Sequence, residues 1–368
     1  MVFPRVLKDV VLISSIAMVL ALAMLVPLGV THAQSLGSYN VQINQTSASG
    51  VSSGAYMAGQ LHVAYSANMV GVAIIAGGPY YCSQSDWNTA VNECWQRGTP
   101  TVNSLEVIER EHRNGKIDDP SNLQDDKVYL FTGSNDKKVA TQVVDAANRQ
   151  YQALVPQANI QYLRDQIPAG HSMVTDDYGN ACSTEGGEYI NDCDYDMAGK
   201  ILEHIYGPLK PRSETLSGQI VEFEQSQFVD VPVCVGMGKK GFAYLPSDCS
   251  KGEASQDRPW PCRVHIVVHG CAQNEKTLGR SYVEHTGYNR WGDSNNIIML
   301  YPQSSDKLNQ FACWDFGQAN YDDKKFHTRE GKQVKTIMNM VKQLAGQSFE
   351  KVDDEKWHIN LGFYELCI

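Results

Sequence analysis

A serine stands between two glycines in the segment Gly50-x-Ser52-x-Gly54. This spacing is typical of a tight strand-to-helix turn that holds a nucleophilic serine in a strained conformation with its hydroxyl exposed. Glycine is favoured on both sides because a side chain there would collide with the neighbouring strand or helix. Residues 39–43 alternate like a strand, and residues 56–69 place apolar residues at helical spacing. Ser52 is therefore the candidate nucleophile, and a Gly/Ser loop without a catalytic role is the alternative.

An acid and a histidine follow at the ends of predicted strands. The apolar residues 127–133 open into Asp136, at the strand end where an open α/β sheet gathers its functional side chains. His171 lies in a loop after the strand-like residues 160–163, where an imidazole can reach both a serine and a carboxylate. Serine, acid and histidine in this order match the chain order of α/β-hydrolases.

Simpler interpretations of these two residues stay open. Asp136 is a common turn residue, and a lone histidine such as His171 is more often structural or exposed. Asp176 and Asp177 are rival candidates for the acid, although they follow the histidine by only a few residues and no predicted strand end carries them.

A late strand reveals an altered chain order. The apolar residues 263–268 end in His269-Gly270-Cys271, a pattern with which hydrolases supply the second oxyanion donor. In those enzymes this strand precedes the nucleophile, whereas here it follows. We therefore expect a circularly permuted α/β-hydrolase fold, with a mostly parallel central sheet and helices on both faces.

The permutation makes two further predictions. Residues 70–78 form a short apolar run typical of a buried parallel strand, which should lie beside the strand that leads to Ser52. Residues 296–302 indicate another buried strand, and residues 331–344 a helix with one apolar face. In the unpermuted order this helix would run straight into the serine strand, so the two ends of the domain should lie close together.

The N-terminal segment predicts export. Residues 1–33 combine a basic start, a long apolar run and a small-residue end, as a cleavable signal peptide does, and an uncleaved membrane anchor is the alternative. Removing Arg5, Lys8 and Asp9 with it subtracts one net positive charge and changes the formal charge from −10 to −11. Because an acidic chain offers no basic stripe, we expect no nucleic-acid partner. We expect no stable membrane association after cleavage.

No internal repeat or linker divides the remaining chain. We therefore expect one catalytic domain at residues 34–346, followed by a tail at residues 347–368 that packs on it, and a monomer.

Ten cysteines in an exported chain predict disulfides. No C-x-x-C pair occurs, so no metal site and no cofactor are predicted. Local spacing favours the pairs Cys82–Cys94, Cys182–Cys193 and Cys249–Cys262. Cys234 and Cys367 either pair with each other or stay free, because spacing alone does not settle their connectivity.

Together these motifs resemble the circularly permuted, secreted single-domain poly(3-hydroxybutyrate) depolymerases. The matching stretches are residues 50–57, 133–136, 169–171, 269–273 and 313–316. The chain differs from the family pattern at Phe316, where a second tryptophan is expected, in the acidic loop at residues 175–193, and in the tail.

The resemblance implies a role for each matched residue. Ser52 would be the nucleophile, His171 the general base and Asp136 its orienting acid. The backbone N–H groups of Ser53 and Cys271 would form the oxyanion hole. The resemblance also implies that Trp314 lines the substrate crevice and that Cys271 pairs with Cys313.

The expected reaction is hydrolysis of a polyester through an acyl-enzyme. Adsorption to an insoluble polymer would need an exposed apolar rim, for which Tyr80, Tyr81, Trp95 and Trp314 are the candidates. One alternative is a secreted esterase for soluble substrates such as feruloyl or short-chain acyl esters. Another is a non-catalytic binding protein on a hydrolase scaffold.

Overall fold

The computed structural model describes residues 35–39, 41–95, 98–250, 261–317, 321, 323–353, 358–360 and 365–367. The predicted signal peptide at residues 1–33 lies outside these residues. Contacts group Gln34–Ile368 into one compact unit. Among the described residues, no helix is both long and apolar enough to cross a membrane.

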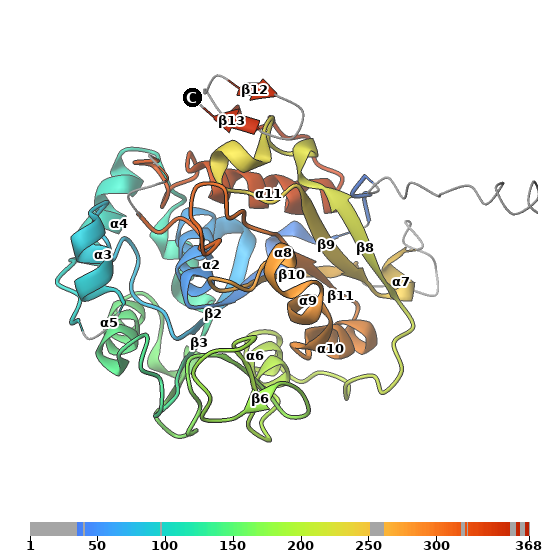
Figure 1. Ribbon diagram of the computed structural model, residues 1–368, viewed down its shortest axis with the longest axis horizontal. Helices are drawn as coiled ribbons and strands as arrows, with labels where there is room; N and C mark the ends of the chain where they lie inside the picture. Colours follow the sequence, from blue (N-terminus) through green and yellow to red (C-terminus); the bar gives the residue numbers. More distant parts are fainter. Residues whose placement is uncertain are drawn as a thin grey trace, which may run out of the picture. The chain divides into compact units, whose positions relative to one another are not determined.

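An eight-stranded sheet forms the centre of this unit, in the order β4-β3-β2-β1-β10-β11-β9-β8 (Figure 1). The six strands from β4 to β11 run parallel, and β9 and β8 continue the sheet in antiparallel pairing. The strands are β1 (Thr46–Val51), β2 (Met69–Ile75), β3 (Lys127–Thr132), β4 (Ile160–Arg164), β8 (Gln219–Glu224), β9 (Lys240–Leu245), β10 (Arg263–Val268) and β11 (Ile297–Tyr301).

Helices cover both faces of the sheet, which separates two apolar cores. One core contains α2, α5 and α11, and the other contains α6, α9 and α10 (Figure 1). The helices are α2 (Ser53–Ala64), α3 (Trp87–Glu93), α4 (Ser104–Arg113), α5 (Thr141–Gln152), α6 (Met197–Tyr206), α7 (Ser247–Ser250), α8 (Glu275–Leu278), α9 (Ser281–His285), α10 (Tyr288–Asn295) and α11 (Lys332–Leu344).

The strand that leads to Ser52 begins later than predicted. Residues 39–43 were expected to form it, but β1 starts at Thr46, and residues 43–45 are a short 3-10 helix. All six residues of β1 are buried in the middle of the sheet, between β2 and β10. Small polar residues fit there because the hydroxyls of Ser47 and Ser49 hydrogen-bond the two ring nitrogens of His265 on β10, at 2.6 and 2.8 Å.

The chain ends meet as the permutation requires. The Tyr39 N–H donates to the Leu344 carbonyl at 2.8 Å, and the Gln343 side chain donates to the Leu36 carbonyl at 3.0 Å. The start of the chain after the predicted cleavage site therefore lies against the end of α11. The expected neighbour of β1 is also confirmed, because β2 pairs with β1 in parallel. The predicted fold class is confirmed.

A small sheet and five disulfides complete the unit. Strands β5 (Met173–Thr175), β6 (Asn180–Ala181) and β7 (Ile190–Asp192) form the acidic loop. The disulfides Cys82–Cys94, Cys182–Cys193, Cys249–Cys262 and Cys271–Cys313 are present, and Cys234 pairs with Cys367. Cys367 ends the hairpin of β12 (His358–Asn360) and β13 (Glu365–Cys367), so this last disulfide fastens the tail to the body.

Candidate active site

Ser52 occupies the turn between β1 and α2 in the strained conformation expected of a nucleophile. Its backbone has φ 58° and ψ −123°, a region that residues with a side chain rarely adopt. A Cβ atom on Gly50 would lie 2.1 Å from the Gly54 carbonyl oxygen, and one on Gly54 would lie 2.3 Å from the His269 carbonyl oxygen. Only glycine fits at both positions, in agreement with the collision expected for any side chain there.

Asp136 and His171 are in direct contact. The Nδ1 atom of His171 lies 2.8 Å from Oδ2 of Asp136, and their side chains are only 8% and 1% exposed. The other oxygen of Asp136 accepts the N–H groups of Lys138 at 2.8 Å and Val139 at 2.9 Å. These bonds fix the carboxylate, which therefore holds Nδ1–H of His171 and leaves Nε2 able to accept a proton. His171 and Ser52 line the same cavity.

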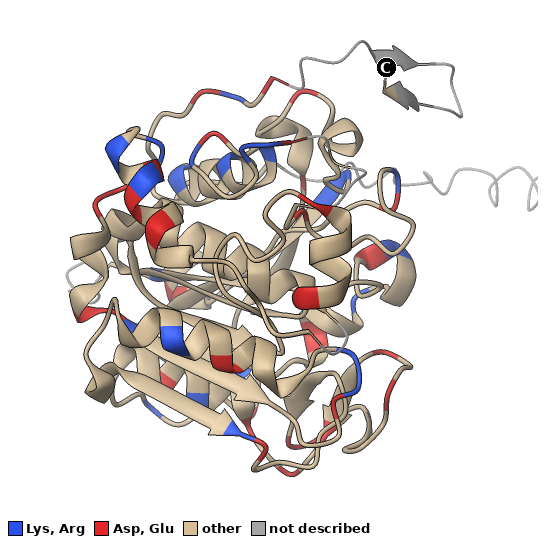
Figure 2. Ribbon diagram, turned by 90° about the vertical axis from the view of Figure 1, so that its left-hand side faces the viewer, with Lys and Arg blue, Asp and Glu red and all other residues tan. Residues whose placement is uncertain are grey.

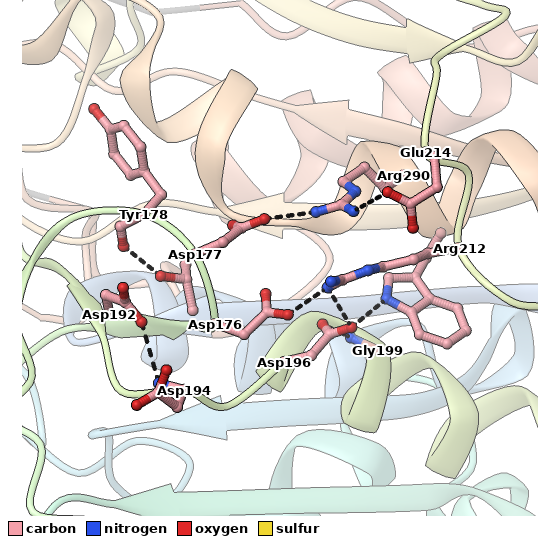
Figure 3. A network of polar contacts seen from close by, with 12 residues as sticks. Asp176, Asp177, Tyr178, Asp192, Asp194, Asp196, Gly199, Arg212, Glu214 and Arg290 are labelled. Atoms are coloured by element: carbon pink, nitrogen blue, oxygen red, sulfur yellow. Dashed lines mark hydrogen bonds and ion pairs between the residues drawn. The ribbon is translucent and has the colours of Figure 1, made fainter.

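The rival acids face other partners (Figure 3). Asp176 pairs with Arg212 and Asp177 with Arg290, each at 2.7 Å. Arg212 also contacts Asp196 at 3.0 Å. Through Asp196, which precedes α6, and Arg290 on α10, these pairs anchor the acidic loop to both helices. Of the three candidate acids, Asp136 is therefore the one that contacts the imidazole of His171.

The end of β10 packs directly against the serine turn. A Cβ atom on Gly270 would lie 3.3 Å from the Ser52 Cβ. Cys271 follows, and it lines the larger cavity together with Ser53. Because Ser53 is the first residue of α2, its N–H has no acceptor within the helix. The two N–H groups predicted as oxyanion donors thus belong to residues that line the same cavity.

A buried imidazole holds the backbone of this segment. The Nδ1 of His269 lies 2.7 Å from the Gly270 carbonyl oxygen, and the Ser304 N–H donates to Nε2 at 3.2 Å. Burial lowers the pKa of His269 to about 4. The ring is therefore neutral near pH 7, with its proton on Nδ1.

Gln273 is a site residue to which the sequence assigns no role. Its Oε1 accepts the Gly270 N–H at 2.7 Å, and its Nε2 donates to the carbonyls of Glu188 at 2.9 Å and Tyr189 at 3.0 Å. It joins the segment around Cys271 to the acidic loop. The only signal in the sequence is its position directly after His269-Gly270-Cys271-Ala272.

Two cavities open on Ser52. The larger has a volume of about 470 Å³ and includes Trp87, Leu308 and Phe316 in its lining. The smaller, of about 200 Å³, includes His171, Lys138 and Tyr189. Ser52, Trp95, Cys271, Phe311 and Cys313 line both cavities.

The aromatic residues expected in the crevice are mostly elsewhere. Trp314 is fully buried, and its indole N–H donates to the His269 carbonyl at 2.9 Å, so it supports the segment around Cys271 from behind. Tyr80 is also buried, and its hydroxyl donates to the His327 carbonyl at 2.6 Å. Tyr81 stacks on Phe326. None of Trp314, Tyr80 and Tyr81 lines either cavity, contrary to prediction; of the four candidates, Trp95 does.

Trp87 and Phe311 are instead the large apolar side chains exposed at the larger cavity, at 43% and 53%. A single aromatic residue among polar neighbours, such as Trp87 at the start of α3 or Phe311, carries no sequence signal that separates an exposed side chain from a buried one.

The described residues contain no group of three or more His, Cys, Asp or Glu that could hold a metal ion. On the side shown in Figure 2, Lys and Arg are interspersed with Asp and Glu.

No protein-family model matches the chain. The chain is 42% identical over 323 residues to the poly(3-hydroxybutyrate) depolymerase of Delftia acidovorans. The aligned region covers 86% of this chain and 63% of that protein. It is 36% identical over 303 residues to the polyhydroxybutyrate depolymerase of Talaromyces funiculosus, which covers 80% of this chain and 86% of that protein. The chain thus spans less than two thirds of the Delftia protein.

Two solved structures are similar over 85% of this chain and 99% of theirs, each at 33% identity. One is the PHB depolymerase from Penicillium funiculosum, with a TM-score of 0.76. The other is a serine-to-alanine variant of a PHB depolymerase complexed with an R3HB trimer, with a TM-score of 0.78. The shared fold and the identity over most of the relatives' length lead to one conclusion: the chain belongs to the polyhydroxybutyrate depolymerase family.

Proposed function

We propose that this chain is a secreted serine esterase that hydrolyses poly(3-hydroxybutyrate) or a related polyester. The observation that carries the proposal is the 2.8 Å contact between His171 and Asp136 at a cavity that also contains Ser52 in its strained turn. The names of the relatives supply the substrate class, and the five disulfides support an oxidising compartment.

The first half of the reaction forms an acyl-enzyme. His171 takes the proton of the Ser52 hydroxyl through Nε2 as Oγ attacks the ester carbonyl carbon. Asp136 stabilises the imidazolium that results. The N–H groups of Ser53 and Cys271 would donate to the oxyanion, each contributing about 3 kcal/mol in the transition state. His171 then returns the proton to the leaving alcohol oxygen, and the C–O bond breaks.

The second half releases the acid. His171 deprotonates a water molecule, which attacks the acyl carbon, and the Ser52 oxygen leaves with the proton. The products are a carboxylic acid and an alcohol, and no oxidant, reductant or metal is consumed.

A polymer chain would lie across Ser52 and extend into both cavities, whose shared lining includes Trp95 and Phe311. Trp87 and Phe311, exposed at the rim, would adsorb to the insoluble surface. We further propose that residues 34–346 form the catalytic domain and that residues 347–368 are a tail held by the Cys234–Cys367 disulfide.

A polymer assay tests the proposal. The mature protein is incubated with amorphous poly(3-hydroxybutyrate), and released 3-hydroxybutyrate and its oligomers are quantified, with a short-chain nitrophenyl ester as the soluble comparison. We expect release from the polymer. Activity on soluble esters alone would assign the chain to the soluble esterases instead, and no activity on either would favour a binding protein.

A further inference from the structure

The loops that carry Asp136 and His171 are joined by a short run of hydrogen bonds. The Ser134 N–H donates to the Ile167 carbonyl at 3.0 Å, and the Asn135 N–H donates to the Ala169 carbonyl at 3.1 Å. The run links the two loops up to the residues that precede the catalytic pair. On the other loop these bonds end at Ala169, two residues before His171.

One carboxylate oxygen continues this connection. The Oε1 atom of Glu185 accepts the Lys137 N–H at 2.7 Å and the His171 N–H at 3.2 Å. Lys137 is the residue directly after Asp136, so one atom contacts both catalytic loops. Two N–H donors cannot bond each other, and an acceptor between them is the arrangement that satisfies both.

From this arrangement we propose that Glu185 is a positioning residue for the catalytic pair. Its Oε1 fixes the separation between the backbones that carry Asp136 and His171, and so maintains the contact between the carboxylate and Nδ1. Glu185 reaches neither the reacting atoms nor the imidazole in this role. The inference rests on the proposed function, because it assigns Glu185 to the same Ser52, His171 and Asp136 site.

The other oxygen of Glu185 supports this role. Oε2 is buried and has no hydrogen-bond partner among the described residues. Burying one carboxylate oxygen without a partner is unfavourable. The two N–H groups that Oε1 accepts, from Lys137 and His171, therefore explain why the side chain is buried here.

The segment that carries Glu185 is itself held in place. The buried Asn191 side chain donates to the carbonyls of Cys182 and Thr184, both at 2.9 Å. The Cys182–Cys193 disulfide closes the same loop. The Gly170 N–H donates to the Cys182 carbonyl at 2.9 Å, and a Cβ on Gly170 would lie 2.2 Å from the Thr184 carbonyl oxygen. The loop thus packs directly on the residue before His171.

The test compares four variants in steady-state kinetics on a soluble ester. Glu185→Ala should lower kcat about 100-fold and leave KM within about twofold, because a small misplacement of the catalytic pair slows the chemistry and not the binding. Glu185→Gln keeps an acceptor oxygen and should retain activity within about threefold. Glu185→Asp, which keeps the charge but withdraws the oxygen, should lose activity like Glu185→Ala and provides the test if the alanine variant fails to fold.

Glu188→Ala is the matched control. Glu188 lies in the same loop and bonds the Tyr178 hydroxyl at 2.9 Å, but no contact joins it to Asp136 or His171 among the described residues. The alanine variant keeps the Glu188 carbonyl that accepts from Gln273 and removes only the side chain, so kcat should stay within about twofold of wild type.

A double-mutant cycle separates positioning from general destabilisation. In an Asp136→Ala background, Glu185→Ala should reduce the residual kcat by less than about threefold, because the contact that Glu185 maintains is already gone. An equal 100-fold loss in both backgrounds, or wild-type kcat in both Glu185→Ala and Glu185→Asp, would overturn the role of Glu185 while leaving the proposed function intact. Wild-type activity in Ser52→Ala would instead overturn the proposed function, and the role of Glu185 with it.

Discussion

On one side of Ser52 the acid and the histidine are held by hydrogen bonds between loops, and on the other side the segment around Cys271 is held by a disulfide and by buried rings. The first side depends on Asp136 accepting two backbone N–H groups and the imidazole. The second depends on the Cys271–Cys313 disulfide, the indole of Trp314 and the neutral His269. Single polar substitutions on the first side should therefore lower kcat, and on the second side reduction of the Cys271–Cys313 disulfide should lower it.

Of the two sides of Ser52, the hydrogen-bonded one should show the larger effect. Asp136→Asn should lower kcat about 10⁴-fold, because an amide favours the wrong tautomer of His171. Steady-state hydrolysis of a soluble ester measures this loss. Asp177→Asn is the matched control and should keep wild-type kcat, since Asp177 pairs with Arg290. A large loss in Asp177→Asn with an active Asp136→Asn would move the acid into the later loop.

The second effect comes from removing the Cys271–Cys313 disulfide, on the other side of Ser52. Replacing Cys271 and Cys313 by serine should lower kcat about 10- to 100-fold, because an oxyanion hole works only when its donors are preorganised. The control replaces Cys249 and Cys262, whose disulfide lies at the opposite end of β10. If both double variants lose the same activity, the Cys271–Cys313 disulfide acts through stability alone. Circular dichroism should show the Cys271 and Cys313 variant still folded when its turnover has fallen.

The sequence was most informative where the signal is local. The contact of Asp136 with His171, and the cavity that His171 shares with Ser52, could be predicted because each of these residues follows a strand, and parallel strands bring their ends to one edge of the sheet. The start of β1 was misplaced because Ser47 and Ser49 are buried by bonding His265, a partner far along the chain.

Residues that act through distant backbone groups could not be predicted. Glu185 contacts N–H groups in other loops, so nothing in its neighbouring sequence marks it. Gln273 contacts carbonyl groups in the acidic loop, and only its position after His269-Gly270-Cys271-Ala272 marks it. Trp314 was expected at the surface of the crevice, yet whether an indole is exposed depends on how the loops pack.

The third effect concerns the rim rather than either side of Ser52. Trp87→Ser combined with Phe311→Ser should weaken adsorption to the polymer about five- to tenfold, because two exposed apolar side chains lose their contact with the surface. Hydrolysis of a short soluble ester should stay within about twofold in the single variant Trp87→Ser, because Trp87 lines only the larger cavity, whereas Phe311 also lines the cavity of Ser52 and His171. Binding isotherms on polymer granules measure adsorption. An equal loss on both substrates would show that these side chains act in the cavity and not at the polymer surface.

The smallest effect is on stability in acid. Burial lowers the pKa of His327 to about 4 and that of His265 to about 3, below the value of about 6.5 in an unfolded chain. Between about pH 6.5 and pH 4 the unfolded chain binds protons that the folded chain does not, so the free energy of unfolding should fall as the pH is lowered through this range.

A variant isolates one of these groups. Neither ring nitrogen of His327 has a partner within hydrogen-bond distance among the described residues, and its Nε2 lies 3.7 Å from Oε1 of Glu111. Its other neighbours, Tyr80, Tyr81 and Phe326, are aromatic. His327→Phe should therefore raise the melting temperature at pH 5 by about 3 °C relative to wild type and less at pH 8. Calorimetry at the two pH values measures the difference. An equal change at both would mean that His327 does not contribute to the loss of stability in acid.

The most direct test of the central claim is to find the acylated residue. The mature protein is labelled with a fluorophosphonate, digested and mapped by mass spectrometry, and the same preparation is assayed for release of 3-hydroxybutyrate from polymer. The account predicts a label on Ser52, lost in Ser52→Ala together with about 10⁶-fold of kcat, while the variant stays folded. A label on Ser53 or on another residue, or polymer hydrolysis that persists in Ser52→Ala, would contradict it.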